Sequence, residues 1–238
     1  MRAELRQPRR IAFSSTRDGN TDMYVMDTDD SNQTRLTDSP GVDRNPDWSP
    51  NGKRLLFNTD RDDGNAEIYV MGADGSDQTR LTDSAGNDTS PAWSPNGKRI
   101  AFDTNRDRNY EIYVMNADGT NPVRIHGTPQ DEEDPVWSPN NKQIVFHSTR
   151  GSTEQLLTQQ IYVMNADGSD QTLLSDMGQF NFGPDWSFHH PKALRPGRSR
   201  TIHASGRAPR CLGRRRAGGD QRRQARAVQP CSGCLTSS

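Results

Sequence analysis

Residues 45–82 read NPDWSPNGKRLLFNTDRDDGNAEIYVMGADGSDQTRLT, and this stretch recurs along the chain. Residues 90–125 repeat it as SPAWSPNGKRIAFDTNRDRNYEIYVMNADGTNPVRI. A third copy begins with DPVWSPNNKQIVFHSTR at residues 134–150 and resumes with IYVMNADGSDQTLL at residues 161–174. Self-similarity at a period of about 45 residues is typical of repeat architectures such as propellers. The aromatic residues that mark the repeat are Trp48, Trp93, Trp137 and Trp186, with Tyr24, Tyr69, Tyr113 and Tyr162.

Each repeat unit divides into four short segments separated by turn sequences. In the first quoted copy, the first segment ends at Trp48, and the other three cover residues 53–57, 67–71 and 78–82. The Asn-Gly pair at 51–52 and the Asp-Gly pair at 74–75 supply the positive φ angles that tight turns need. None of the segments shows the apolar spacing near 3.6 that a helix requires. The unit therefore predicts four β-strands and an all-β fold.

The third strand of each unit is apolar on both faces, because Ile68, Tyr69, Val70 and Met71 are consecutive. A propeller buries both faces, since each four-stranded blade lies between two neighbours. The sequence thus predicts a β-propeller of about four blades, with the Trp and Tyr columns as its structural core. Residues 11–38 supply only three strands of a first blade, and residues 183–187 supply a lone first strand. An open fragment of a larger propeller and a four-bladed ring both fit this count.

The pattern P-x-W-S-P-N-G-K-x-I-x-F, followed by R-D-G-N-x-E-I-Y-V-M-N-A-D-G-S, resembles the repeat of the TolB-like β-propeller family over about residues 10–188. The resemblance implies a non-catalytic scaffold for protein–protein interaction, with protein transport in the Tol–Pal envelope system and the periplasm as its setting. The N-terminal sequence MRAELRQPRR has no apolar stretch typical of a secretory signal. Since the family closes its ring with six blades, the repeat count favours a truncated protein.

Charge divides the chain near Phe188. Residues 1–188 carry 18 basic and 30 acidic side chains, a net charge of −12, whereas residues 189–238 carry 12 and 1, a net charge of +11. The second segment is rich in Arg, Gly, Ala, Pro and Ser, a composition that predicts disorder. It is either a basic tail or out-of-frame sequence. The predicted domains are an N-terminal extension at 1–10, the propeller at 11–188 and the tail at 189–238.

The repeats carry no recognisable catalytic motif, so we predict that the chain is not an enzyme and needs no cofactor. G-x-S-x-G and the Walker phosphate loop are both missing. His126 and His147 occupy different positions in the unit and form no metal-binding pair. An alternative stays open, in which the chain is the propeller of a larger hydrolase, such as a prolyl oligopeptidase-type peptidase, without its catalytic domain. The acidic repeats disfavour nucleic acid as a partner, and no apolar run approaches the roughly 20 residues of a membrane span.

The loops that enter the first strand of each unit carry the candidate partner-binding residues. The first strand of a propeller blade is innermost, so positions five and three residues before each Trp are expected at the mouth of the central channel. Acidic side chains there predict a protein partner of basic character, and carboxylates could also hold Ca²⁺. The candidates are Asp43, Asp88, Glu132, Asn45, Ser90 and Asp134, with Asn181 in the last unit and Asp18, Asp60, Asp62, Asp63 and Asp107 in loops of the same face.

Overall fold

The computed structural model describes residues 10–62, 64–152, 158–175 and 183–186. These residues form fifteen β-strands and no helix, so none of them belongs to a helix able to cross a membrane. The chain divides into two units, Met1–His190 and Pro191–Ser238, and every described residue belongs to the first. The predicted tail, Asp63, Asn181 and the predicted extension up to residue 9 lie outside the described residues.

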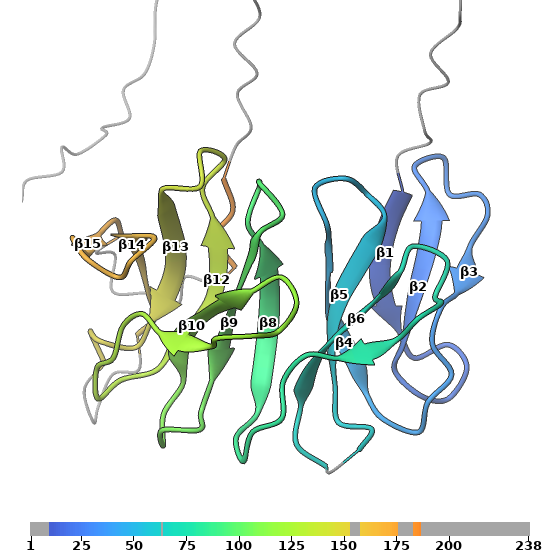
Figure 1. Ribbon diagram of the computed structural model, residues 1–238, viewed down its shortest axis with the longest axis horizontal. Helices are drawn as coiled ribbons and strands as arrows, with labels where there is room; N and C mark the ends of the chain where they lie inside the picture. Colours follow the sequence, from blue (N-terminus) through green and yellow to red (C-terminus); the bar gives the residue numbers. More distant parts are fainter. Residues whose placement is uncertain (1–9, 63, 153–157, 176–182, 187–238) are drawn as a thin grey trace, which may run out of the picture. The chain divides into compact units, whose positions relative to one another are not determined.

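The strands form four antiparallel sheets in which neighbours in the chain are neighbours in the sheet (Figure 1). The first sheet contains β1 (Arg10–Ser15), β2 (Asp22–Asp27) and β3 (Thr34–Arg35). The second contains β4 (Asp43–Trp48), β5 (Arg54–Thr59), β6 (Glu67–Gly72) and β7 (Thr79–Arg80). The third contains β8 (Asp88–Trp93), β9 (Arg99–Thr104), β10 (Glu111–Asn116) and β11 (Val123–Arg124). The fourth contains β12 (Glu132–Trp137), β13 (Gln143–Ser148), β14 (Gln160–Asn165) and β15 (Thr172–Leu173). The predicted all-β fold with four-stranded blades is therefore confirmed.

The turns between the strands are built as the sequence indicates. Gly52 has φ 66° and Gly75 has φ 87°, both in the left-handed region that glycine adopts without steric cost. In the turn after β4, the Ser49 hydroxyl donates to Asn51 Oδ1 at 2.9 Å and accepts from the Arg54 N–H at 2.9 Å. The hairpin that leads into the second strand of the sheet is thus fixed by its own side chains.

Successive sheets pack face to face through the first strand of the later sheet. Strand β4 contacts β1 and β2, β8 contacts β5 and β6, and β12 contacts β9 and β10. One core cluster joins Leu56, Ile68 and Val70 of the second sheet to Trp93 and Phe102 of the third. This packing explains why the third strand of the unit is apolar on both faces.

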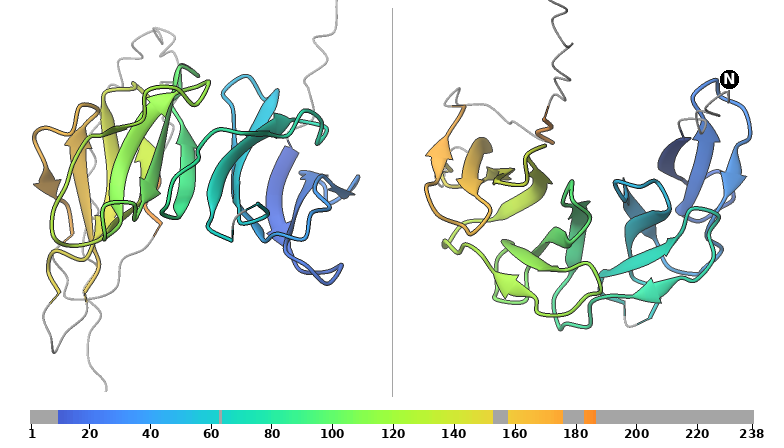
Figure 2. Two further views of the ribbon diagram at one scale, coloured as in Figure 1. Left: turned by 60° about the horizontal axis from the view of Figure 1, so that its bottom comes forward. Right: turned by 45° about the horizontal axis from the view of Figure 1, so that its top comes forward.

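The first strands β4, β8 and β12 also contact one another in turn, and Figure 2 shows the sheets following one another in chain order. Among the described strands, none of the first sheet contacts a strand of the fourth. The described strands therefore form consecutive blades that do not close into a ring.

The aromatic columns lie mostly inside. Trp93 and Trp137 are buried, as are Tyr24, Tyr69 and Tyr113, whereas Trp48, Trp186 and Tyr162 are half-buried. In every sheet a phenylalanine faces a tyrosine of the next strand with ring centroids 5.7–5.9 Å apart. An arginine guanidinium covers both rings of each pair, at 4.4–5.7 Å from the centroids: Arg17, Arg61, Arg106 and Arg150. Such stacking contributes cation–π attraction in addition to area burial.

Candidate functional site

A cavity of about 770 Å³ runs along strands β4, β8 and β12. Each strand contributes a tryptophan and a proline two residues before it, and residues 183–185 close the lining. The aromatic and proline residues give the cavity a largely apolar surface, interrupted by a few polar side chains. The lining from the three strands includes Trp48, Trp93, Trp137, Pro46, Pro91 and Pro135.

A bulge in each first strand aims one polar residue into this cavity. Pairing with the second strand is interrupted between Arg44 and Asp47 in β4, and at the same place in β8 and β12. The bulged residues have positive φ angles, 55° at Asn45, 48° at Ser90 and 54° at Asp134. Bulges redirect side chains, and backbone held in this region of φ clusters at functional sites. The structure therefore places these three sequence candidates together on the cavity wall.

The three bulged residues differ in their hydrogen bonds and in their exposure. The Ser90 hydroxyl donates to Asp134 Oδ1 at 2.8 Å, which connects β8 to β12. Asp134 keeps 37% of its side chain exposed, and Asn45 is exposed. These side chains therefore offer a carboxylate and an amide to the cavity.

The three acids two residues earlier are placed differently. Asp43, Asp88 and Glu132 are completely buried. Each carboxylate is held by the arginine that covers the aromatic pair of its own sheet, as in the two bonds from Arg106 Nη2 to Asp88 at 2.8 and 3.0 Å. The matching pairs are Arg61 with Asp43 at 3.0 and 3.1 Å, and Arg150 Nε with Glu132 at 3.0 Å. These carboxylates lie under the surface and tie the loop after the second strand to the first strand. Partner binding by these three residues stays a prediction.

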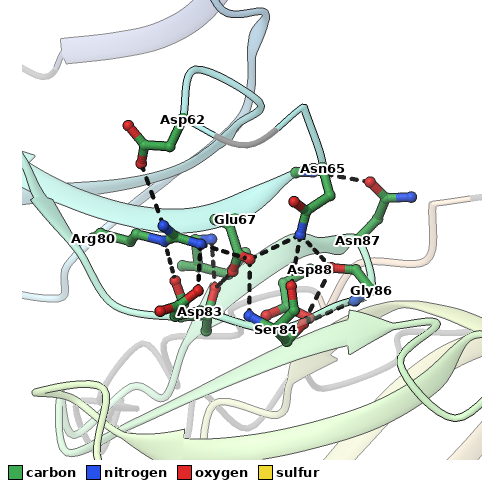
Figure 3. A network of polar contacts seen from close by, with 12 residues as sticks. Asp62, Asn65, Glu67, Arg80, Asp83, Ser84, Gly86, Asn87 and Asp88 are labelled. Carbon is green, nitrogen blue, oxygen red and sulfur yellow. Dashed lines mark hydrogen bonds and ion pairs between the residues drawn. The ribbon is translucent and has the colours of Figure 1, made fainter.

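Figure 3 shows how the loop before β8 is fixed by a partly buried polar network. The Asn65 amide donates to the carbonyl oxygens of Ser84 and Gly86, at 2.8 and 2.9 Å. Arg80 Nη2 contacts Glu67 at 3.0 Å, and the Ser84 hydroxyl donates to Asp88 at 3.1 Å. The loop that leads to the cavity is therefore attached both to its own sheet and to the preceding one.

The predicted acidic loop face is largely engaged in internal hydrogen bonds. Asp18 and Asp62 accept from the hydroxyls of Tyr24 and Tyr69, and Asp107 accepts from Tyr113 at 2.5 Å. Asp60 accepts from the backbone N–H of Val42 at 2.6 Å. In the part of the chain that the structure describes, no three His, Cys, Asp or Glu side chains gather as a metal site would require.

A cluster that the sequence analysis missed lies where the third and fourth sheets meet beside the cavity. His147 contacts Glu133 at 3.1 Å and Asp134 at 3.4 Å. Burial alone would lower the pKa of His147, but the hydrogen bond with Glu133 and the charge of Asp134 raise it above its usual value. Burial raises the pKa of Asp103 to about 6. His147, Asp103 and Asn58 share one position of the repeat, so their differing identities gave no repeat signal.

Asp47 lines the cavity and is a further titratable residue whose pKa is clearly raised. Its Oδ2 accepts the backbone N–H of Trp93 at 2.6 Å, and burial raises its pKa to about 6. In the unfolded chain an aspartate titrates near pH 4. The folded protein therefore keeps a proton between about pH 4 and 6 that the unfolded chain releases. The stability contributed by this proton is full below pH 4 and is lost as pH rises through 6.

Between pH 4 and pH 7, the unfolding free energy of the wild type should fall because Asp47 ionises. In an Asp47→Asn variant we expect this fall to be about 1–2 kcal/mol smaller. Asparagine keeps an acceptor for the Trp93 N–H but cannot ionise. Urea unfolding at a series of pH values measures this slope. An Asp47→Ala control should show the same weak dependence of stability on pH as Asp47→Asn. It should be less stable than Asp47→Asn at every pH, because it also loses the hydrogen bond from the Trp93 N–H. Equal slopes for the wild type and Asp47→Asn would contradict the assignment.

Comparison with known proteins identifies the repeat. The family model of the TolB beta propeller domain matches residues 7–89 and 82–195. A Tol-Pal system protein TolB from Syntrophotalea carbinolica is 47% identical over 47 residues, which is 20% of this chain and 11% of that protein. The structure of putative TolB from Agrobacterium tumefaciens aligns with a TM-score of 0.62 and 26% identity, covering 69% of this chain and 60% of that one. TolB from Acinetobacter baumannii aligns with a TM-score of 0.61 and 23% identity, covering 72% and 43%. The chain thus spans only part of the length of each of these proteins.

Proposed function

This chain belongs to the TolB β-propeller family, and from that premise we propose that it is a non-catalytic scaffold that binds a protein segment in the cavity along β4, β8 and β12. The cavity is the observation that carries the proposal. Its tryptophans and prolines provide the apolar, aromatic centre that protein interfaces use, and polar residues surround it. A narrow segment of a partner, rather than a broad flat surface, fits a concave site of this kind.

Charge around the cavity favours a basic segment. Asp134 and Asp185 line it, Glu133 lies next to Asp134, and residues 1–188 as a whole carry a net charge of −12. Complementary charge speeds association and selects the partner more than it adds affinity. Binding should therefore weaken as salt concentration rises. The buried acids Asp43, Asp88 and Glu132 contribute by holding the loops that carry the cavity residues.

The Tol–Pal name of the matched relatives supports a setting in the cell envelope. We extend that setting to this chain as part of the proposal, with a periplasmic location and a role in protein transport across the envelope. The prediction of a hydrolase propeller stays open but is favoured by none of the described residues.

We expect a photo-crosslinking amino acid at Ala92, which lines the cavity, to capture a partner protein in cells that produce this chain. The same amino acid at Val123, 58% exposed on the outer strand β11, is the matched control and should capture much less. Mass spectrometry of the adducts identifies the partner. Equal capture at both positions, or none at Ala92, would contradict the proposed site.

Once the partner is captured, an Asp185→Lys variant should bind it about tenfold more weakly, because it reverses an exposed charge on the cavity wall. Asp77→Lys makes the same charge change in an exposed turn outside the cavity and should leave affinity within about twofold. Titration calorimetry with the purified partner, at low and high salt, measures both. Unchanged affinity for Asp185→Lys would remove the electrostatic part of the proposal.

A further inference from the structure

One backbone contact recurs wherever one sheet packs on the next. The turn between the third and fourth strands carries a glycine, Gly75, Gly119 or Gly168, with φ 87°, 85° and 87°. A β-carbon added to these glycines would lie 2.8, 2.7 and 1.7 Å from a carbonyl oxygen of the preceding sheet, that of Leu36, Leu81 and Ile125 respectively. Each glycine is therefore required both by its φ angle and by the close approach of the preceding sheet.

The first sheet has an aspartate, Asp30, at this position. The turn is otherwise the same, since the Asp30 N–H donates to the Asp27 carbonyl at 3.1 Å as the Gly75 N–H donates to Gly72 at 3.0 Å. Asp30 also keeps a positive φ, 67°. A β-carbon and a carboxylate thus stand where the other three sheets leave room for a neighbour.

The glutamine that follows the turn is also engaged differently in the first sheet. Gln78 of the second sheet donates to the Leu36 carbonyl of the preceding sheet at 3.3 Å. Its counterpart Gln33 donates instead to the Asp30 carboxylate at 2.7 Å. Asp30 and Gln33, whose counterparts in the second sheet contact the preceding sheet, are therefore hydrogen-bonded to each other.

The fourth sheet presents the complementary half of the contact. The Leu174 N–H donates to the Ile161 carbonyl at 2.8 Å, as the Leu36 N–H donates to the Met23 carbonyl at 2.7 Å, so Leu174 follows β15 with the same backbone pairing. Leu36 is 9% exposed beneath its neighbour, whereas Leu173 and Leu174 are 38% and 58% exposed. The fourth sheet thus offers the carbonyl and the apolar side chain that a glycine turn would cover.

We propose that Asp30 prevents copies of this chain from stacking end to end, with the fourth sheet of one copy on the first sheet of another. In the three internal contacts, the turn of the later sheet carries glycine and its first strand, β4, β8 or β12, packs on the preceding sheet. The first sheet lacks that strand, so a stacked copy would make only the part of the contact around the turn. With Asp30, the β-carbon would collide with the Leu174 carbonyl, and the carboxylate, which accepts from Gln33, would lose water beside a second acceptor oxygen. Asp30 therefore acts as a selectivity residue that excludes self-association through this turn.

Sedimentation equilibrium of the full chain tests this proposal. The wild type should sediment as a monomer, and Asp30→Gly should associate in a concentration-dependent way, with an association constant raised about tenfold or more. Asp30→Ala should stay monomeric, because alanine removes the charge but keeps the β-carbon. Work in about 0.3 M NaCl screens attraction between the acidic repeats and the basic residues 189–238.

The double variant Asp30→Gly with Leu174→Asp identifies the faces involved. It should return to a monomer if association uses the fourth sheet. Three results would overturn the proposal. These are a wild type that already associates through these faces, an Asp30→Gly variant as monomeric as the wild type, and association of Asp30→Gly that Leu174→Asp leaves intact.

Discussion

An Arg106→Ala variant is expected to unfold with a free energy about 3–5 kcal/mol below that of the wild type. The reason is the carboxylate that the change leaves behind. Asp88 is completely buried, and Arg106 Nη2 reaches both of its oxygens at 2.8 and 3.0 Å. Removing one member of a buried ion pair costs far more than the pair itself contributes, because the remaining charge stays desolvated. The same guanidinium also covers the rings of Phe102 and Tyr113.

Urea unfolding followed by tryptophan fluorescence measures this loss. Arg106→Lys should fall between the wild type and the alanine variant, because lysine keeps the charge but loses the planar stacking and the second hydrogen bond. Arg54→Ala is the matched control, since Arg54 is exposed, and should change stability by no more than about 0.5 kcal/mol. A loss below about 1 kcal/mol for Arg106→Ala would mean that Asp88 is not held as a buried charge.

The same pair shows where prediction from the sequence stops. The repeat places Asp88 in the loop that enters a first strand, and in the structure it is the first residue of β8. Whether its carboxylate faces the channel or the sheet depends on Arg106, which lies in a loop beyond the second strand. A signal was present, because acid and arginine are 18 residues apart in all three units, at 43 and 61, 88 and 106, and 132 and 150. Only the folded hairpin shows that this spacing brings the two charges together.

The fold itself could be predicted further than the site. Period, turn dipeptides and the apolar run at Ile68–Met71 fix the strands and their two-sided burial, because these are local consequences of backbone geometry. At the bulge, the Asn45-Pro46 pair marks an interruption of the strand but does not tell that the Asn45 side chain lines a cavity. The His147 cluster joins β12 and β13 of the fourth sheet through residues that the other units replace, so the repeat pattern gives no sign of it. Residues that interrupt the repeat, such as Asp30 in place of glycine, carry information that the consensus does not.

A Trp93→Ala variant is expected to lose about 3–5 kcal/mol of unfolding free energy, the range found when a buried large aromatic side chain is deleted. Trp93 is 8% exposed and packs with Leu56, Ile68 and Val70 of the preceding sheet, so its removal opens a void between two blades. The cost includes both lost transfer free energy and a cavity that the rigid sheets on either side cannot close.

Trp48→Ala provides a comparison at the equivalent position of the second sheet. Trp48 is half-buried, so less apolar area returns to water and the expected loss is about half as large. Calorimetric or urea unfolding of both variants gives the two losses on one scale. Both tryptophans also line the cavity, so the ratio of the two stability losses shows how much each side chain contributes to packing between blades. A loss below about 1 kcal/mol for Trp93→Ala would mean that this column contributes little to packing between blades and is retained for what the cavity binds.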